Sequence, residues 1–539
     1  MKARLRRLMP GTLVLLCGLL GYWLVQDAAP APSPPSPRKD LVATPRQPLP
    51  EAPKPTKSFV RDRFPDGTTI EIFGSCHEEE LILRFPTEAS YNSFLYALNC
   101  SSVRLIDRLD PLRAVRIGFN AKEMEVLTAL FEDEQITTYK TLTRLPEAPR
   151  AWGGASQGAV AFGSQVLPWL GVTGDNSRWG SGVKLAVLDT GIVAHPALPR
   201  IARSIEIFPF SDDPATTHFH GTAIASLIAG NDPMVHGVAP AVDLISVRVL
   251  DDRGVSDSFA IAAGILAAMD AGAEILNLSL GEQSDSPLVG DAIHMAIDRG
   301  IVVVASSGNE GLQEAKYPAA YPGVIGVGAV DASGERMAFS NLGSGLGITA
   351  PGYGLNAAAP GGGYLAISGT SASAPLVAAA IAAVMSDGSG RRVSAAEAAK
   401  LVLAYTDDEG LPGPDAEYGS GVLNLGRVMN RSIPGLSDAV ITNLRLVPTS
   451  SGSSRDEVQL TVQNRGTATL INTLVEITTP AGTTSINATT IPACSIQTFT
   501  VPFNAQRGEG RISASVSLGN SAIDLTPQNN FIETAFSRS

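Results

Sequence analysis

One serine stands in a setting that could make it a nucleophile. Ser371 lies in the stretch Ser368–Pro375, among glycine, alanine and other small residues, and directly precedes the Ala/Val/Ile-rich run Leu376–Met385. That run predicts a buried helix, whose positive N-terminal end and unpaired N–H groups favour negative charge beside the serine. Small neighbours would let a substrate backbone come close. A serine at this place could equally cap a core helix, so the rest of the chain must decide.

Three further residues complete a hydrolytic set, each at the end of a predicted element. Asp189 ends the apolar run Val183–Leu188, which predicts a buried parallel strand, and α/β sheets place their sites at such strand ends. His220 begins a predicted helix of small residues, and Asn309 lies in a turn rich in Ser and Gly. Each alone has an ordinary structural explanation. Together with Ser371, they supply an orienting carboxylate, a base, an amide donor and a nucleophile.

The segment that carries these residues alternates strand and helix patterns. We expect strands at Asp243–Leu250, Glu274–Leu280 and Ile301–Ala305, and helices at Asp257–Ala271 and Val289–Arg299. This alternation predicts a doubly wound α/β domain with a parallel sheet, covering about residues 148–431.

The motifs around the four residues resemble those of the subtilisin-like serine peptidases, the subtilases. The active-site motifs are Ala186–Ile192 around Asp189, then His220-Gly221-Thr222, then Gly369–Pro375 around Ser371, in the chain order of that family. Connecting motifs that also fit are Gly237–Pro240, Asn277–Gly281, Ser307–Gly311, Tyr317-Pro318, Tyr321–Ile325 and Ala350–Gly352. The resemblance extends from about Leu170 to Met429 and implies a serine endopeptidase that acts on proteins or peptides.

The resemblance also implies a role for each residue. Ser371 would attack the scissile carbonyl and form an acyl-enzyme, His220 would transfer the proton, and Asp189 would orient the imidazole. The Asn309 side chain and the backbone N–H of Ser371 would hold the oxyanion. The edge that pairs with substrate backbone corresponds to Ser279, Leu280 and Gly281, and a wall of the specificity pocket to Ser306, Ser307 and Gly308.

Several positions depart from the usual pattern of the family. Ala223 stands where many members carry a second, non-catalytic histidine. Lys316 falls near the pocket floor by resemblance, which would favour acidic substrates, but we expect it to point to solvent. Structural calcium is implied by the resemblance alone, and the calcium-binding loops of many members are not recognisable here. Asp212-Asp213 and Asp251-Asp252 offer carboxylates that we expect to be solvated, so no metal site is assigned.

Residues 1–27 have the pattern of a targeting segment. The basic stretch Lys2–Arg7 precedes the mostly apolar run Leu8–Val25. Such a segment is a secretory signal peptide or a retained N-terminal membrane anchor, and we slightly favour the signal peptide. Either one predicts an exported protein that is periplasmic, secreted or held at the cell surface. Residues 28–58 are rich in proline and predict an extended linker.

Residues 59–147 predict a small α+β domain. Strands are expected at Leu81–Phe85, Ser102–Ile106, Ala114–Phe119 and Ile136–Leu142, and helices at Thr87–Leu98 and Ala121–Glu134. This order is that of the ferredoxin-like plan. The family resemblance implies an inhibitory pro-domain that acts as an intramolecular partner and is removed by self-cleavage within Pro146–Ser164. Cys76 and Cys100 could form a disulfide in an exported protein, with two free thiols as the alternative.

The last segment, residues 436–539, has short alternating strands separated by turns rich in Gly, Asn, Ser and Thr. This pattern predicts a β-sandwich of immunoglobulin-like type. The stretches Leu460–Gly466 and Thr526–Asn530 are similar to adhesion-related bacterial modules. We nevertheless expect a stabilising or spacing role rather than the binding of a specific ligand.

Composition and motif order weigh against other functions. The 539-residue chain has a formal net charge of −12, which argues against nucleic acid and anionic lipid surfaces as partners. One alternative is a catalytically inactive, subtilase-like binding or adhesion protein, and the four intact site residues argue against it. An esterase or lipase would need a Gly-x-Ser-x-Gly elbow, which the stretch Gly369–Ser373 does not provide.

Overall fold

The computed structural model describes residues 80–99, 103–119, 137–138, 142–144, 159–198, 200–209, 218–282, 284–386, 392–447, 456–503, 508–519 and 522–538. The chain divides into two units, residues 1–58 and residues 59–539, and every described residue belongs to the second. Within these ranges, no helix is long and apolar enough to cross a bilayer. The predicted targeting segment, the proline-rich linker, Cys76 and Cys100 lie outside the described residues.

A seven-stranded parallel sheet of order β15-β14-β13-β12-β6-β10-β7 forms the centre of the middle domain. Its strands are β6 (Lys184–Asp189), β7 (Arg203–Glu206), β10 (Asp243–Arg248), β12 (Ile275–Leu278), β13 (Val302–Ser306), β14 (Ile325–Val330) and β15 (Leu346–Pro351). The strands predicted here are present, with ends shifted by one or two residues. The predicted parallel sheet is therefore confirmed.

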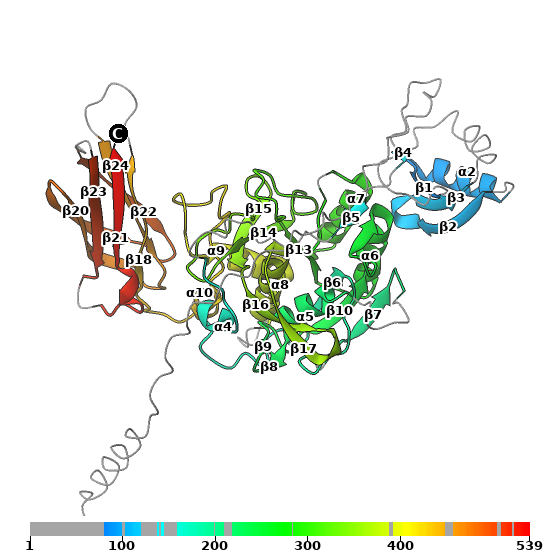
Figure 1. Cartoon of the computed structure of the whole chain (residues 1–539), viewed down its shortest axis with the longest axis horizontal. Helices are drawn as coiled ribbons and strands as arrows, with labels where there is room; N and C mark the ends of the chain where they lie inside the picture. The colour runs from blue at the N-terminus through cyan, green and yellow to red at the C-terminus, as the bar shows by residue number, and fades with distance from the viewer. Residues whose placement is uncertain are drawn as a thin grey trace, which may run out of the picture. The chain divides into compact units, whose positions relative to one another are not determined.

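Helices cover both faces of this sheet (Figure 1). On one face lie α5 (His220–Ala229), α8 (Thr370–Met385) and α9 (Ala395–Ala404), and on the other α6 (Ser258–Asp270) and α7 (Pro287–Asp298). Alternate side chains of β6 enter opposite cores, as strand geometry requires: Leu185 and Val187 pack on the α8 side, and Ala186 and Leu188 on the α6 side. The domain is thus doubly wound.

Helix α8 is the most deeply buried element of the domain. All its residues are buried, which agrees with the predicted core helix. It begins at Thr370, so Ser371 stands in its first turn, and Pro375 lies inside it.

Shorter elements complete the middle domain. They are α4 (Val166–Trp169), β8 (Asn231–Asp232), β9 (Val235–His236), β11 (Val255–Asp257), β16 (Leu355–Ala359), β17 (Gly363–Ile367) and α10 (Leu425–Asn430).

The N-terminal domain contains an antiparallel sheet of order β2-β3-β1-β4. Its elements are β1 (Glu80–Arg84), α2 (Glu88–Leu98), β2 (Arg104–Leu109), β3 (Ala114–Gly118) and β4 (Thr137–Thr138). Thr87 and Ser90 form a capping box at the start of α2. The second predicted helix lies outside the described residues, so the ferredoxin-like plan stays a prediction.

This sheet contacts helices α6 and α7 of the middle domain. Its apolar contribution to the shared core comes from Ile82, Leu109, Leu112 and Ala114. Arg84 forms an ion pair with Asp291 on α7, and Arg116 lies 3.2 Å from the carboxylate of Asp257, the N-cap of α6. The following strand, β5 (Leu142–Arg144), pairs antiparallel with β11. The N-terminal domain is therefore held by packing, by charge and by an added strand.

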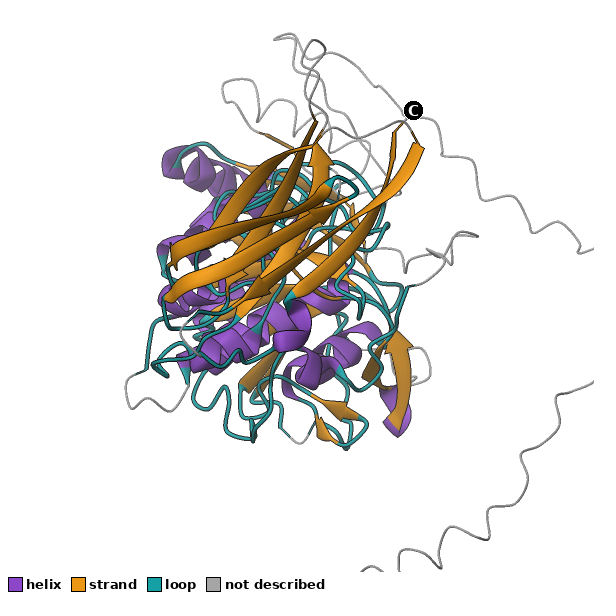
Figure 2. Cartoon of the chain, turned by 90° about the vertical axis from the view of Figure 1, so that its left-hand side faces the viewer, coloured by secondary structure: helices purple, strands orange, loops and turns teal. Residues whose placement is uncertain are grey.

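The C-terminal domain consists of two antiparallel sheets around one apolar core (Figure 2). One sheet has the order β18-β19-β22 and the other β21-β20-β23-β24. The strands are β18 (Ala439–Val447), β19 (Asp456–Asn464), β20 (Leu470–Thr479), β21 (Gly482–Ile491), β22 (Ile496–Phe503), β23 (Gly508–Ser517) and β24 (Phe531–Arg538). Strand β21 was not predicted, because most of its residues are exposed and polar. The immunoglobulin-like type and the adhesion likeness remain predictions.

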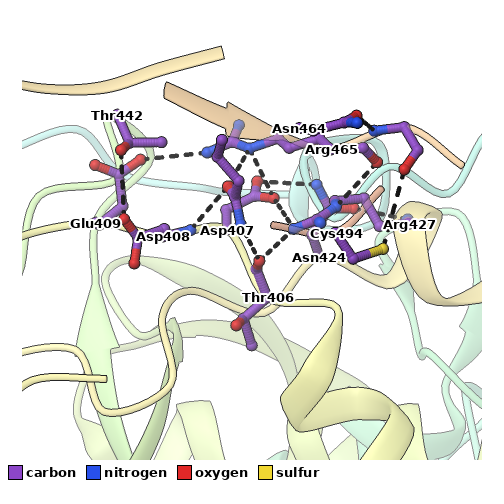
Figure 3. A network of polar contacts seen from close by, with 12 residues as sticks. Thr406, Asp407, Asp408, Glu409, Asn424, Arg427, Thr442, Asn464, Arg465 and Cys494 are labelled. Carbon is purple, nitrogen blue, oxygen red and sulfur yellow. Dashed lines mark hydrogen bonds and ion pairs between the residues drawn. The ribbon is translucent and has the colours of Figure 1, made fainter. Parts of the chain in front are cut away.

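A polar network joins the end of the middle domain to the C-terminal domain (Figure 3). Arg427 of α10 is 9% exposed, and its guanidinium donates to the carbonyls of Thr406 and Arg465 and lies 3.2 Å from the carboxylate of Asp407. Arg465, which follows β19, lies 3.1 Å from the same carboxylate. Gln463 accepts a backbone N–H from the neighbouring Asp408. Two arginines, one from each domain, therefore share one carboxylate.

Candidate active site

Asp189 and His220 form the first half of the site. Asp189 is the last residue of β6 and is fully buried, and His220 is the first residue of α5. The imidazole Nδ1 lies 2.9 Å from both carboxylate oxygens, and the backbone N–H of Thr190 donates to one of them at 2.7 Å. A carboxylate in this place keeps the proton on Nδ1, which leaves Nε2 as the base.

Glycine at position 221 makes this approach of helix and strand possible. A Cβ atom at this position would lie 2.3 Å from the carbonyl oxygen of Gly191, in the turn after β6. The hydroxyl of Thr190 also accepts the backbone N–H of Gly221 at 3.0 Å. The start of α5 is thus fixed against the carboxyl end of β6, and this places His220 beside Asp189.

Ser371 and Asn309 form the second half of the site. Ser371 is 6% exposed, and it follows Gly369, whose φ of 135° strongly favours glycine. A Cβ atom at position 369 would lie 2.9 Å from the Asn309 amide nitrogen and 3.3 Å from the Ser371 hydroxyl. The amide donor and the nucleophile therefore border the same small space, which a larger residue would fill.

The Asn309 side chain is oriented by Thr370. Its carbonyl oxygen accepts the backbone N–H of Thr370 at 2.8 Å and the Thr370 hydroxyl at 2.9 Å. These two bonds turn the amide nitrogen of Asn309 toward Gly369. Together with the N-terminal end of α8, the arrangement can stabilise negative charge on an oxygen beside Ser371. Thr370 was not singled out from the sequence, although it directly precedes the nucleophile.

The predicted substrate-binding segments follow the carboxyl ends of β12 and β13. The side chains of Ser279, Ser306 and Ser307 are buried. Their hydroxyls all donate to backbone carbonyls: Ser279 to Ser371 at 2.9 Å, Ser306 to Leu280 at 3.5 Å and Ser307 to Asn341 at 3.1 Å. Backbone groups, rather than these hydroxyls, are thus what the segments can offer to a substrate. Their binding role stays a prediction.

From the sequence we expected Lys316 to point to solvent, and this prediction is wrong. Its side chain is 15% exposed, and its ammonium group lies 2.6 Å from the carboxylate of Glu310. Its backbone N–H donates to the carbonyl of Ser307, and its Cβ lies 3.5 Å from where a Cβ of Gly281 would be. These two contacts place Lys316 between the two predicted substrate-binding segments. Glu310 compensates its charge there.

Two ionisable neighbours, Arg248 and His218, complete the electrostatics of the site. Arg248 is almost fully buried, is paired in register with Asp189 and donates to the carbonyl of Thr190. In the sequence, Arg248 is visible only as a single charge at the end of the apolar strand β10. His218 accepts the backbone N–H of His220 through its Nδ1 at 3.2 Å. Burial lowers the pKa of His218, and the nearby His220 lowers it further.

Of the two acidic pairs, the structure describes Asp251-Asp252, and both of its carboxylates are engaged by protein groups. Asp251 accepts backbone N–H groups of its own turn, and Asp252 forms an ion pair with Arg248 at 2.8 Å. Asp212-Asp213 lies outside the described residues. Among the residues that the structure does describe, no group of three His, Cys, Asp or Glu side chains could hold a metal ion.

Comparison with known proteins gives matches over this same domain. Residues 180–421 match the model of the Peptidase S8, or subtilase, family. A thermostable alkaline protease from Halalkalibacterium halodurans is 35% identical over 299 residues, which are 54% of this chain and 81% of that protein. Subtilisin Savinase from Lederbergia lenta is 41% identical over 207 residues, which are 38% and 77%. A solved protease domain of PatA gives a TM-score of 0.44 at 29% identity, over 48% of this chain and 97% of that one.

Proposed function

This chain belongs to the subtilase family and is a serine endopeptidase, and we propose that it is made as an exported precursor that activates itself by removing its N-terminal domain. The observation that carries the proposal is the antiparallel pairing of β5 with β11, while the Asp189–His220 pair is already formed. The targeting pattern of residues 1–27 supports export.

The proposed catalytic cycle uses the four site residues. The Ser371 hydroxyl attacks the substrate carbonyl carbon while His220 Nε2 takes its proton, and Asp189 stabilises the imidazolium that forms. The oxyanion lies between the Asn309 amide and the backbone N–H of Ser371, and one such donor contributes about 3 kcal/mol to transition-state stabilisation. The intermediate collapses as His220 protonates the leaving amine, and water then hydrolyses the acyl-enzyme by the same steps.

The N-terminal domain is proposed to inhibit the enzyme until it is removed. An extended segment that pairs with an exposed strand binds as a peptide does, through backbone hydrogen bonds. Strand β5 pairs with β11 in this way, with Val255 opposite Arg144 and Asp257 opposite Leu142. The shared core and the ion pairs of Arg84 and Arg116 hold the domain in place. Cleavage within residues 146–164 would then release it.

The test uses the chain from residue 59 onward and unfolded casein, with a Ser371→Ala variant and a sulfonyl fluoride inhibitor as controls. We expect the wild type alone to lose its N-terminal domain and to degrade casein, and the inhibitor to block this degradation. N-terminal sequencing of the product gives the boundary. If purified Ser371→Ala were cleaved at the same bond, self-processing would be excluded. A processed and folded wild type that leaves casein intact would favour an enzyme of narrow specificity or a binding protein instead.

A further inference from the structure

The carbonyl of the nucleophilic residue lacks its helical hydrogen bond. In an α-helix the carbonyl of residue 371 accepts the N–H of residue 375, but position 375 of α8 is a proline, which has no N–H. Every residue of α8 is buried, so water is not at hand to replace the missing donor. A buried carbonyl without a partner would destabilise this turn of the helix.

The hydroxyl of Ser279 supplies the missing donor. Ser279 follows β12 directly, is 0% exposed, and its Oγ donates to the carbonyl oxygen of Ser371 at 2.9 Å. Asn277, also fully buried, donates its side-chain N–H to the same Oγ at 3.0 Å. Because the Ser279 oxygen accepts from Asn277, its own hydrogen is directed to the carbonyl of Ser371. The three groups form one chain of hydrogen bonds from the sheet to the helix.

The side chain of Asn277 is poorly explained by folding alone. Its carbonyl oxygen is buried and finds no hydrogen-bond partner among the described residues. Burying a half-paired amide in the middle strand of a sheet destabilises the fold, and an apolar residue would avoid this. Among the described residues, its side chain makes one hydrogen bond, and that bond orients Ser279.

We propose that Ser279 is a positioning residue, which holds the peptide group of the nucleophile in place and is itself oriented by Asn277. The inference rests on the proposed role of Ser371. Fixing the Ser371 carbonyl fixes the backbone that carries both its hydroxyl and, through the same turn, its oxyanion-binding N–H. Reaction rates are sensitive to misplacement of a nucleophile by a fraction of an ångström, whereas substrate binding through a neighbouring backbone edge is less so.

The first experiment compares Ser279→Ala with the wild type on a chromogenic peptide. We expect kcat to fall about tenfold, because the backbone that carries the nucleophile is then held less precisely, with KM unchanged within about twofold. The matched control is Ser386→Ala at the far end of α8, where the hydroxyl donates to Ala382 at 3.1 Å. This variant should lower the melting temperature and leave kcat unaltered.

The second experiment restores the missing donor by another route. In a Pro375→Ala background, residue 375 regains an N–H that can bond to the carbonyl of Ser371. We expect Ser279→Ala to cost much less kcat in this background than in the wild type. A fluorophosphonate titration counts intact active sites in every variant. If Ser279→Ala does not fold, Ser279→Cys, a weaker donor in the same place, should show a reduced kcat.

The outcomes separate this inference from the proposed function. An inactive wild type would defeat the proposed function itself. An active wild type with an unchanged kcat in folded Ser279→Ala or Ser279→Cys would overturn only the positioning role. Equal losses in the two backgrounds would also overturn it, since the hydrogen bond to the Ser371 carbonyl would then not be what matters.

Discussion

Lys316 and Glu310 bring an ion pair to the region between the two predicted substrate-binding segments. The 2.6 Å contact neutralises the lysine, and Glu310 is also held by the Asn341 side chain at 3.0 Å. An acidic substrate side chain entering this region would meet little net positive charge. The net charge of this region therefore depends on Glu310 as much as on Lys316.

We predict that Glu310→Gln shifts the preference toward acidic residues before the cleaved bond. Glutamine can still accept the N–H groups of Asn309 and Asn341 through its one carbonyl oxygen, but it loses the bond to Lys316 and leaves the charge of that lysine uncompensated. The ratio of kcat/KM for peptides with Glu and with Gln at this position should rise about tenfold at low salt. Adding Lys316→Met should remove the gain. An unaltered ratio would show that Lys316 does not line the pocket.

The sequence predicted the residues of the site better than the way in which each acts. Asp189, His220, Asn309 and Ser371 were singled out because each stands at the end of a predicted element in a motif that resembles the family. The sequence predicts that the backbone at Ser279 binds substrate, and it gave no sign that the Ser279 hydroxyl bonds to the Ser371 carbonyl across the sheet–helix boundary. Lys316 was misjudged because its partner Glu310 is brought near by a turn, which no periodicity reveals.

Among the elements, long apolar runs were the easiest to predict. Strand β6 and helix α8 are apolar on all sides, and their burial follows directly from that pattern. Strand β21 escaped prediction because its exposed threonines carry no apolar alternation. Helix α8 begins at Thr370, which confirms that Ser371 lies near the N-terminus of the helix predicted from the apolar run.

Strand β5 and helix α6 meet at Asp257, which suggests a test of the inhibitory contact. Asp257 caps α6 through Ala260 and lies 3.2 Å from Arg116 of the N-terminal domain. We predict that Arg116→Leu shortens the delay between cleavage of the precursor and the appearance of peptidase activity, because the cleaved domain then leaves faster. The delay should fall about threefold or more, given about 1 kcal/mol for a partly exposed pair.

The delay is measured by following cleavage on gels and activity on a chromogenic peptide in the same sample. The control is Arg108→Leu, on β2, whose ion pair with Asp110 lies within the N-terminal domain and should not affect release. Equal delays in the wild type and Arg116→Leu would show that the contact with Asp257 does not retain the domain.

At the scale of the whole molecule, the C-terminal domain is coupled to the middle domain by the shared carboxylate of Asp407. We predict that Arg465→Ala lowers the free energy of unfolding by about 2 kcal/mol, because a largely buried carboxylate loses one of its two cations. Arg511→Ala is the control, since its pair with Glu533 is exposed and should contribute under about 0.5 kcal/mol. Thermal unfolding measures both, and equal shifts would contradict a coupling role.

The same region should make stability depend on pH. Burial raises the pKa of Asp438 to about 6, and the nearby carboxylate of Asp524 adds to this effect. A raised carboxyl pKa means that the folded state binds the proton more tightly than the unfolded state. The contribution of Asp438 to the free energy of unfolding is therefore greatest below about pH 4. It falls as the pH rises through about 6, by at most about 3 kcal/mol.

We predict that Asp438→Asn removes this slope, because asparagine carries no charge at any pH. The variant should be more stable than the wild type at pH 8 and show no advantage at pH 4. Denaturant unfolding at the two pH values measures the difference. A variant that is less stable at pH 8 would show that the Asp438 charge is favourable where it lies.

The network around Asp407 also has a consequence for the order in which the protein can be completed. Arg427 and the Thr406–Asp408 stretch need Gln463 and Arg465, which emerge from the ribosome after all four site residues. A chain that stops before β19 would carry a full catalytic set on a domain whose last edge is unpaired. We therefore expect a chain that ends before β19 to be less stable than the full chain, and more easily degraded by the cell that makes it.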